Sequence, residues 1–108
     1  MAQHALFVFT DPVEGKEEEY NDWYNNVHLA EVCQVEGFLS AQRFKVSDVM
    51  PGVTDHGYIA IYQVETNDPA KTIKALSAAA RGMNMSDSIN LKGAKSSLGE
   101  VCSPIVTR

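Results

Sequence analysis

The first half of the chain alternates between an apolar run, a turn and an amphipathic stretch. The β-prone run at 5–10 predicts a strand, and Pro12 and Gly15 mark a turn after it. Three consecutive glutamates, which suit the positive end of a helix dipole, then precede apolar residues spaced three and four apart. This spacing predicts a helix from Lys16 that ends before Gly37 and has a candidate kink or restart near His28. The spaced residues are Tyr20, Trp23, Tyr24 and Val27.

The second half begins with two β-prone segments, 38–46 and 58–64, joined by a loop that carries Pro51 and Gly52. The segment 58–64 is apolar on both faces, which is typical of a central strand.

A polar cap and a proline at the first helical position open the stretch 66–81, and its apolar residues share one side. It predicts the second helix. The stretch 82–97 is rich in glycine and serine and predicts an irregular segment with at most one short helical turn. The last strand is predicted at 98–107, where Pro104 indicates an edge or exchanged position.

The resulting order βαββαβ predicts an α+β fold in one domain spanning 1–108, with a four-stranded antiparallel sheet in the ferredoxin-like arrangement. Both helices must cover one face of the sheet. The 58–64 strand carries Tyr58 and Tyr62 on one side and Ile59 and Ile61 on the other, so neither side suits water. We therefore expect a homodimer through the uncovered sheet face.

Charge and composition narrow the partners and the compartment. The net charge is −5 and the nine basic residues are scattered, so we expect no nucleic-acid partner. The apolar runs are too short for a membrane span or a signal-peptide core, so no membrane association is expected. Cys33 and Cys102 are well separated and predict free thiols in a reduced compartment. These features favour a cytoplasmic location.

The first helix carries the candidate chemistry. At about 100° per residue, Glu31 falls inside the stripe that starts at Tyr20, while His28 lies on its border with Asn21 nearby. A histidine beside a carboxylate on a cavity wall can act as general base or acid. We take His28 and Glu31 as candidate catalytic residues. Trp23, Tyr24 and Asn21 are candidate substrate-binding residues.

Each candidate on this helix also has a structural interpretation. Trp23, Tyr24 and Val27 have the spacing of ordinary core residues. His28 can bond a backbone carbonyl at the helix end, and Glu31 would face solvent if the helix breaks at 27.

Other polar residues are harder to assign. Tyr62 is the candidate tyrosine to complete an acid–base pair with His28. Gln42 and Arg43 fall on opposite sides of their strand, so one of them faces either the cavity or the partner subunit. The segment 86–88 is read as a helix cap in preference to a polar lid over the pocket.

The remaining titratable residues favour no cofactor site. His4 and His56 are expected on the solvated surface, and no two histidines have a metal-ligand spacing. Neither a metal nor a nucleotide site is predicted, because the cysteines lack close partners and no glycine-rich phosphate motif occurs.

The string EEYNDWYNNVHLAEVCQVEGFLSAQRFKV resembles the EthD-like branch of the dimeric α+β barrel superfamily, most specifically through Trp23, Tyr24 and His28 in W-Y-x-x-x-H. The resemblance covers roughly residues 5–106. It implies a dimer with a pocket between sheet and helices. Superfamily members include cofactor-free monooxygenases, cyclases, isomerases and haem-degrading enzymes, so the chemistry stays open. A haem-degrading member would carry a histidine on or just after the second helix, and this chain has none there.

Three functions follow as hypotheses. The first is a cofactor-independent enzyme, of the lyase, isomerase or cyclase type, doing proton-transfer chemistry on a small hydrophobic or aromatic metabolite. The reaction would be cyclisation, isomerisation, elimination or carbon–carbon cleavage. The second is a non-catalytic binding or accessory protein that uses the same pocket, and the third is a cofactor-free monooxygenase.

Overall fold

Four antiparallel strands form one sheet in the computed structural model, which describes residues 2–52 and 54–108. Position 53, inside the predicted loop, and position 1 lie outside the described residues. The sheet has the spatial order β2-β3-β1-β4, so β3 is central as predicted. The strands are β1 (Ala2–Thr10), β2 (Phe38–Lys45), β3 (Tyr58–Thr66) and β4 (Lys95–Glu100).

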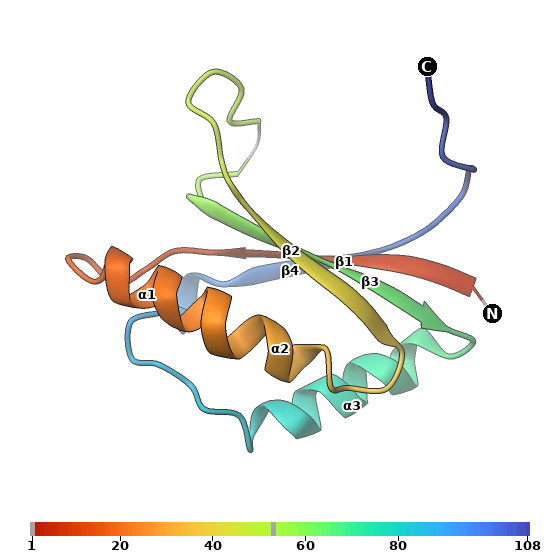
Figure 1. The fold of residues 1–108 in the computed structure, drawn as a ribbon, viewed down its shortest axis with the longest axis horizontal. Coiled ribbons are helices and arrows are strands. Elements are labelled where there is room, and N and C mark those ends of the chain that lie inside the picture. Colours follow the sequence, from red (N-terminus) through yellow and green to blue (C-terminus); the bar gives the residue numbers. More distant parts are fainter. Residues whose placement is uncertain (1, 53) are drawn as a thin grey trace.

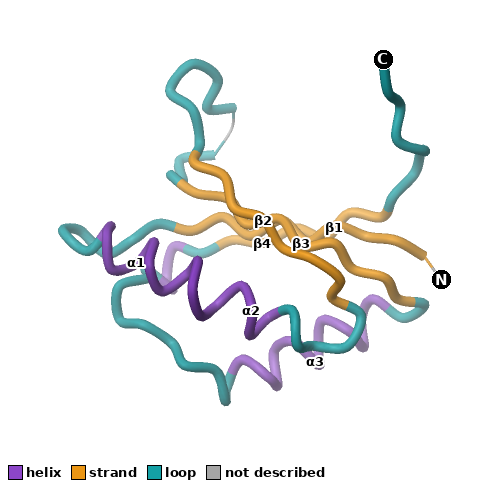
Figure 2. The backbone as a smooth tube through the Cα atoms, viewed as in Figure 1, coloured by secondary structure: helices purple, strands orange, loops and turns teal. Residues whose placement is uncertain are grey.

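The helices lie together on one face of this sheet, as Figures 1 and 2 show. The predicted ferredoxin-like βαββαβ arrangement is therefore confirmed. The loop between β2 and β3 and the C-terminal tail extend from the other side (Figure 1). The first helix consists of α1 (Glu17–Trp23), the π-helical turn η1 (Tyr24–His28) and α2 (Leu29–Val32); α3 (Pro69–Ala80) and the 3₁₀ turn η2 (Leu91–Gly93) follow later.

Strand periodicity sorts the side chains of β3 into two environments. Tyr58, Ala60, Tyr62 and Val64 are buried beneath the helices, whereas Ile59 and Ile61 are only half-buried on the opposite face. The first set forms the centre of the core together with Tyr20 and Tyr24 from the helix. The core therefore sits between sheet and helices, and the second set stays uncovered.

The second helix follows its sequence signals closely. Asp68 caps α3, its carboxylate accepting a hydrogen bond from the Lys71 backbone N–H at 3.1 Å, and Pro69 takes the first helical position. The predicted helix is thus confirmed, with bounds Pro69–Ala80 inside the predicted stretch.

The two terminal strands differ from their predicted bounds. β1 begins at Ala2, because its backbone pairs with β3 as far as Thr66. β4 begins at Lys95 and ends at Glu100, so the predicted strand at 98–107 is wrong over most of its length. The serines after Lys95 give no apolar signal, yet their backbone pairs with β1 opposite Phe7 and Val8.

A glycine makes the turn into β2 possible. Gly37 has φ of 95°, a region that favours glycine, and a Cβ there would lie 3.0 Å from the Glu65 carbonyl oxygen. The Gly37 carbonyl in turn accepts a hydrogen bond from the Glu65 N–H at 2.8 Å. The backbone at Gly37, just before β2, therefore approaches β3 too closely for a side chain.

Gly37→Ala is expected to lower the free energy of unfolding by about 1–3 kcal/mol, since the new Cβ combines backbone strain with this clash. Gly15→Ala is the matched control, because Gly15 also has a positive φ of 81° but nothing lies within 4 Å of its added Cβ. Urea unfolding of both variants measures the difference. If both variants lost the same free energy of unfolding, the close approach of Gly37 to the Glu65 carbonyl would not contribute to stability.

Candidate functional site

A cavity of about 300 Å³ lies between the sheet and the helices. Its walls are mostly apolar, and three of its side chains can exchange or hold a proton: His28, Tyr24 and Tyr62. The structure thus brings together three residues that the sequence analysis singled out. The other lining residues are Leu6, Val8, Val32, Ile73, Leu76, Ser77, Ala80, Met83, Met85 and Ser96.

The π-helical turn decides where His28 lies. The Leu29 N–H donates to the Tyr24 carbonyl five residues earlier, and such turns occur often at functional sites. The kink expected near His28 is this turn. The wider turn changes the helical phase after Tyr24. The positions expected from about 100° per residue therefore do not hold for the residues that follow it.

Aromatic rings enclose the His28 imidazole on two sides. The Trp23 indole stacks on it with ring centroids 4.6 Å apart and an interplanar angle of 21°, and the Tyr24 ring meets it edge-on at 5.1 Å. Nδ1 of His28 is buried and has no hydrogen-bond partner among the described residues. Burial lowers the pKa of His28, and the nearby Glu31 carboxylate partly opposes this by raising it. The neutral imidazole is therefore the favoured form at neutral pH.

Tyr24 and Tyr62 form a buried phenol pair on the cavity. Their exposed fractions are 1% and 2%, and the two side chains interact. Desolvation by burial raises the pKa of Tyr24 and raises that of Tyr62 far above the usual range. Both phenols therefore stay protonated, and because their side chains are hydrogen-bonded to each other, the pair has one hydroxyl hydrogen left to donate to a bound oxygen.

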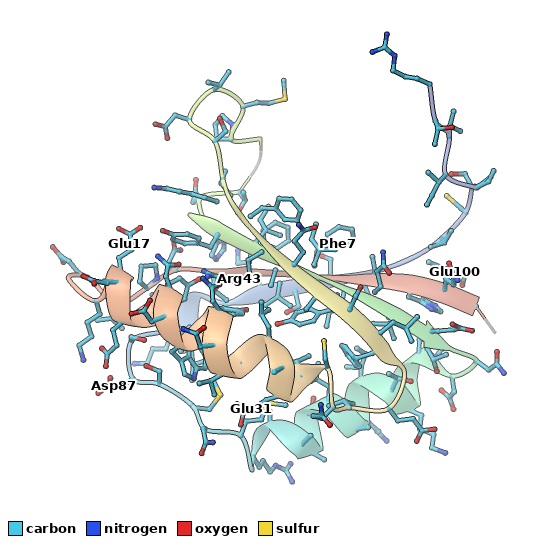
Figure 3. All side chains as sticks on the ribbon, viewed as in Figure 1. Phe7, Glu17, Glu31, Arg43, Asp87 and Glu100 are labelled. Carbon is cyan, nitrogen blue, oxygen red and sulfur yellow. The ribbon has the colours of Figure 1, made fainter. Side chains whose placement is uncertain are left out.

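Glu31 points away from the His28 cavity and toward the segment after α3 (Figure 3). Its Oε2 accepts a hydrogen bond from the Asn84 N–H at 2.9 Å. The other carboxylate oxygen is buried and, within the described part of the chain, has no partner. Glu31 lines a separate hollow of about 500 Å³ between α2 and α3. Its effect on His28 is therefore electrostatic.

Trp23 and Asn21 lie at the edge of the site. Trp23 is half-buried, packs against the core and donates from Nε1 to the Asn84 carbonyl at 2.7 Å. Asn21 accepts a hydrogen bond from Arg43 at 2.9 Å and donates to the Tyr58 hydroxyl at 3.3 Å. Neither side chain is part of the cavity wall, and their substrate contacts stay predictions.

The sequence analysis left the side of Arg43 open, and the structure turns it toward the helices (Figure 3). Its guanidinium carbon lies 4.4 Å from the ring centroid of Tyr24 and 5.1 Å from those of Tyr20 and Tyr58. The strand pairing explains this choice, because Arg43 is directly opposite the buried Ala60. Arg43 thus supports the cavity wall from behind Tyr24.

Three expectations about other polar residues are wrong. His4 is 5% exposed because it points to the helix side of β1, and it lies 3.8 Å from Glu100. His56 is half-buried, with its ring nitrogens bonded to Thr54 and to the Gly93 carbonyl. The segment 86–88 caps no helix. Its serines form a local turn that places Ile89 in a β-bridge with Pro12.

Within residues 2–52 and 54–108, no three His, Cys, Asp or Glu side chains are grouped to hold a metal ion. No helix in the described part of the chain is long and apolar enough to cross a bilayer.

No protein-family model matches the sequence, and no curated protein matches it significantly. Solved structures do share the fold. An EthD family protein from Bacillus halodurans is 15% identical, with a TM-score of 0.59, over 94% of this chain and 100% of that one. SnoaB, a cofactor-independent oxygenase from Streptomyces nogalater, is 12% identical with a TM-score of 0.52, over 98% of this chain and 97% of that one.

A third neighbour is a mutant of MhuD with two manganese protoporphyrin IX molecules bound per active site. It is 16% identical with a TM-score of 0.64, over 96% of this chain and 99% of that one. These likenesses define the chain as a protein with the dimeric α+β barrel fold. The fold that the resemblance implied is confirmed, and an EthD family protein is among the proteins that share it.

The porphyrin of that neighbour raises the question of a haem site in this chain. The α3 side chains on the cavity are Ile73, Leu76, Ser77 and Ala80, and the segment 70–86 contains no histidine. These residues do not fit a haem ligated from α3, and we assign no haem step.

Proposed function

We propose that the protein is a cofactor-independent enzyme that performs proton-transfer chemistry on a small hydrophobic or aromatic metabolite. One observation carries the proposal: an imidazole and two phenols share an otherwise apolar cavity of about 300 Å³. A volume of this size accommodates a small ligand with two or three fused rings. Burial keeps the imidazole neutral and the phenols protonated, so a base and a hydrogen-bond donor from the phenol pair are present at the same pH.

The reaction starts with removal of a proton from a C–H bond beside a substrate carbonyl. His28 accepts that proton, and the electron pair of the C–H bond moves to give an enolate. The Tyr62 hydroxyl donates a hydrogen bond to the enolate oxygen, where the charge develops. The imidazolium then returns its proton to another atom of the substrate, which gives isomerisation, or to a leaving group, which gives elimination. Glu31 assists by favouring the charged imidazolium.

Two alternatives use the same cavity. A carbanion formed by His28 could react with dioxygen, and SnoaB is a cofactor-independent oxygenase with the same fold. Oxygen consumption with α-naphthol would support this cofactor-free monooxygenase. A non-catalytic binding protein would instead hold its ligand without any turnover and keep its affinity after His28→Gln.

We also propose a homodimer through the uncovered sheet face, with the small ligand enclosed in each subunit. Phe7 lies opposite Ile61 and Phe9 opposite Ile59 on that face, while Phe44 from β2 is 45% exposed. A contiguous apolar patch of this kind is typical of an interaction surface. A second copy of the same sheet would match this patch in chemistry.

Deuterium exchange tests the proposed activity. β-Tetralone, a bicyclic aromatic ketone, is incubated with the protein in D₂O, and NMR follows deuterium entering beside the carbonyl. We expect catalysed exchange whose rate falls at low pH along a limb below the ordinary histidine pKa of about 6.5, because burial lowers the pKa of His28. The base is active above that pKa and lost below it. Binding without exchange would favour the accessory protein, and a limb above the ordinary value would contradict His28 as the base.

A further inference from the structure

A tight turn after α3 forms part of the cavity wall. The Met85 N–H donates to the Met83 carbonyl at 3.0 Å, which closes a three-residue turn centred on Asn84. Met83 and Met85, on either side of that centre, both line the cavity. The Asn84 side chain makes none of these contacts, and the residue is exposed. The turn therefore presents two flexible thioethers to the cavity.

Both backbone groups of Asn84 are bonded to side chains of the first helix. Its N–H donates to Glu31 at 2.9 Å, and its carbonyl accepts from the Trp23 indole N–H at 2.7 Å. These residues lie before and after the π-helical turn, so one break in helical phase brings both to the same residue. We call the Trp23–Asn84–Glu31 contacts the turn clamp.

The turn clamp is also linked to the candidate base. The Trp23 indole that bonds Asn84 stacks on His28 at 4.6 Å. Glu31 keeps one oxygen buried without a partner in the described chain, which is costly for a carboxylate and needs a role beyond simple packing. Methionine side chains adapt readily to ligands of different shape. The backbone of this wall is held by the two hydrogen bonds of the turn clamp, while its methionine side chains can change rotamer.

We propose that Trp23 and Glu31 are positioning residues that hold the Met83–Met85 turn as a movable wall of the cavity. By holding the turn, they set how tightly the cavity closes on a hydrophobic ligand and how fast the ligand leaves. The proposal rests on the ligand-binding cavity of the proposed function but needs no turnover. It gives Glu31 a task that depends on its acceptor oxygen and not on its charge.

Amide hydrogen exchange and methionine-methyl NMR test the turn clamp. Trp23→Phe keeps an aromatic ring stacked on His28 but removes the indole N–H that bonds the Asn84 carbonyl. Glu31→Met keeps the length of the side chain but removes the oxygen that accepts from the Asn84 N–H. Each should raise exchange at the turn by about fivefold to tenfold, the equivalent of one hydrogen bond. With labelled methyl groups of Met83 and Met85 as reporters, each should also raise the dissociation rate of α-naphthol by a similar factor.

Glu31→Gln supplies the rescue, because its amide oxygen can still accept from Asn84, and both rates should return to within about twofold of wild type. Asn84→Ala is the control that keeps the backbone and should change neither rate. Wild-type exchange in Trp23→Phe and Glu31→Met would overturn the proposal, as would Glu31→Gln behaving like Glu31→Met. Failure of deuterium exchange into β-tetralone would remove the proposed activity and leave this result standing.

Discussion

Replacing His28 with glutamine is expected to lower the rate of deuterium exchange into β-tetralone by about 10²–10⁴-fold, the usual contribution of a positioned base. Glutamine keeps polarity and roughly the length of the side chain but cannot take up a proton near neutral pH. Affinity for the ketone should change little, since apolar residues from the sheet and α3 form most of the cavity wall. NMR exchange rates at several ketone concentrations separate the two effects.

His56→Gln is the matched control for this experiment. It makes the same chemical change at a histidine that bonds Thr54 and Gly93 and lies outside the His28 cavity. Its exchange rate should equal that of the wild type. If both variants were equally active, His28 would not be the base. If only affinity fell in His28→Gln, the residue would contribute to binding alone.

Ile61→Asp is expected to shift the protein from dimer to monomer, raising the dissociation constant at least about 100-fold, or by about 2.7 kcal/mol. Ile61 lies on the uncovered face directly opposite Phe7 and Gln42. A carboxylate at the centre of an apolar interface would lose its hydration without gaining a partner. Sedimentation equilibrium at micromolar concentration measures the change.

Ala78→Asp adds the same charge at an exposed position of α3, on the opposite side of the molecule from the uncovered face. This control should remain a dimer. A wild-type protein that sediments as a monomer at these concentrations would contradict the proposed interface directly. Dissociation of both variants would indicate a general effect of charge.

The strands and helices were predictable where burial follows a regular period. β3 and α3 carry their signals within their own residues, as alternation in the strand and as the Asp68–Pro69 start of the helix. β4 carries no such signal, because Ser96 and Ser97 enter the sheet through backbone pairing with β1. Its position depends on partners that lie far away in the sequence.

The site was predictable in the same uneven way. His28, Tyr24 and Tyr62 were all singled out from the sequence and lie on one cavity, but the ideal helical period could not place His28, because the π-helical turn changes the phase after Tyr24. Their catalytic roles stay predictions. Arg43 could not be assigned, because strand parity alone does not say which side faces the helices. The contact of Glu31 with Asn84 joins residues 53 positions apart, and no local pattern predicts it.

The π-helical turn at 24–28 also limits what the spacing W-Y-x-x-x-H means. If the same sequence formed a regular α-helix, the histidine and every later residue would point in a different direction relative to the tyrosine than they do here. A relative with an identical string but no such turn would therefore direct its imidazole elsewhere. Conversely, a relative whose histidine is shifted by one position could present it to the same cavity. Two proteins of this fold can thus share a motif without sharing a site, or share a site without the motif.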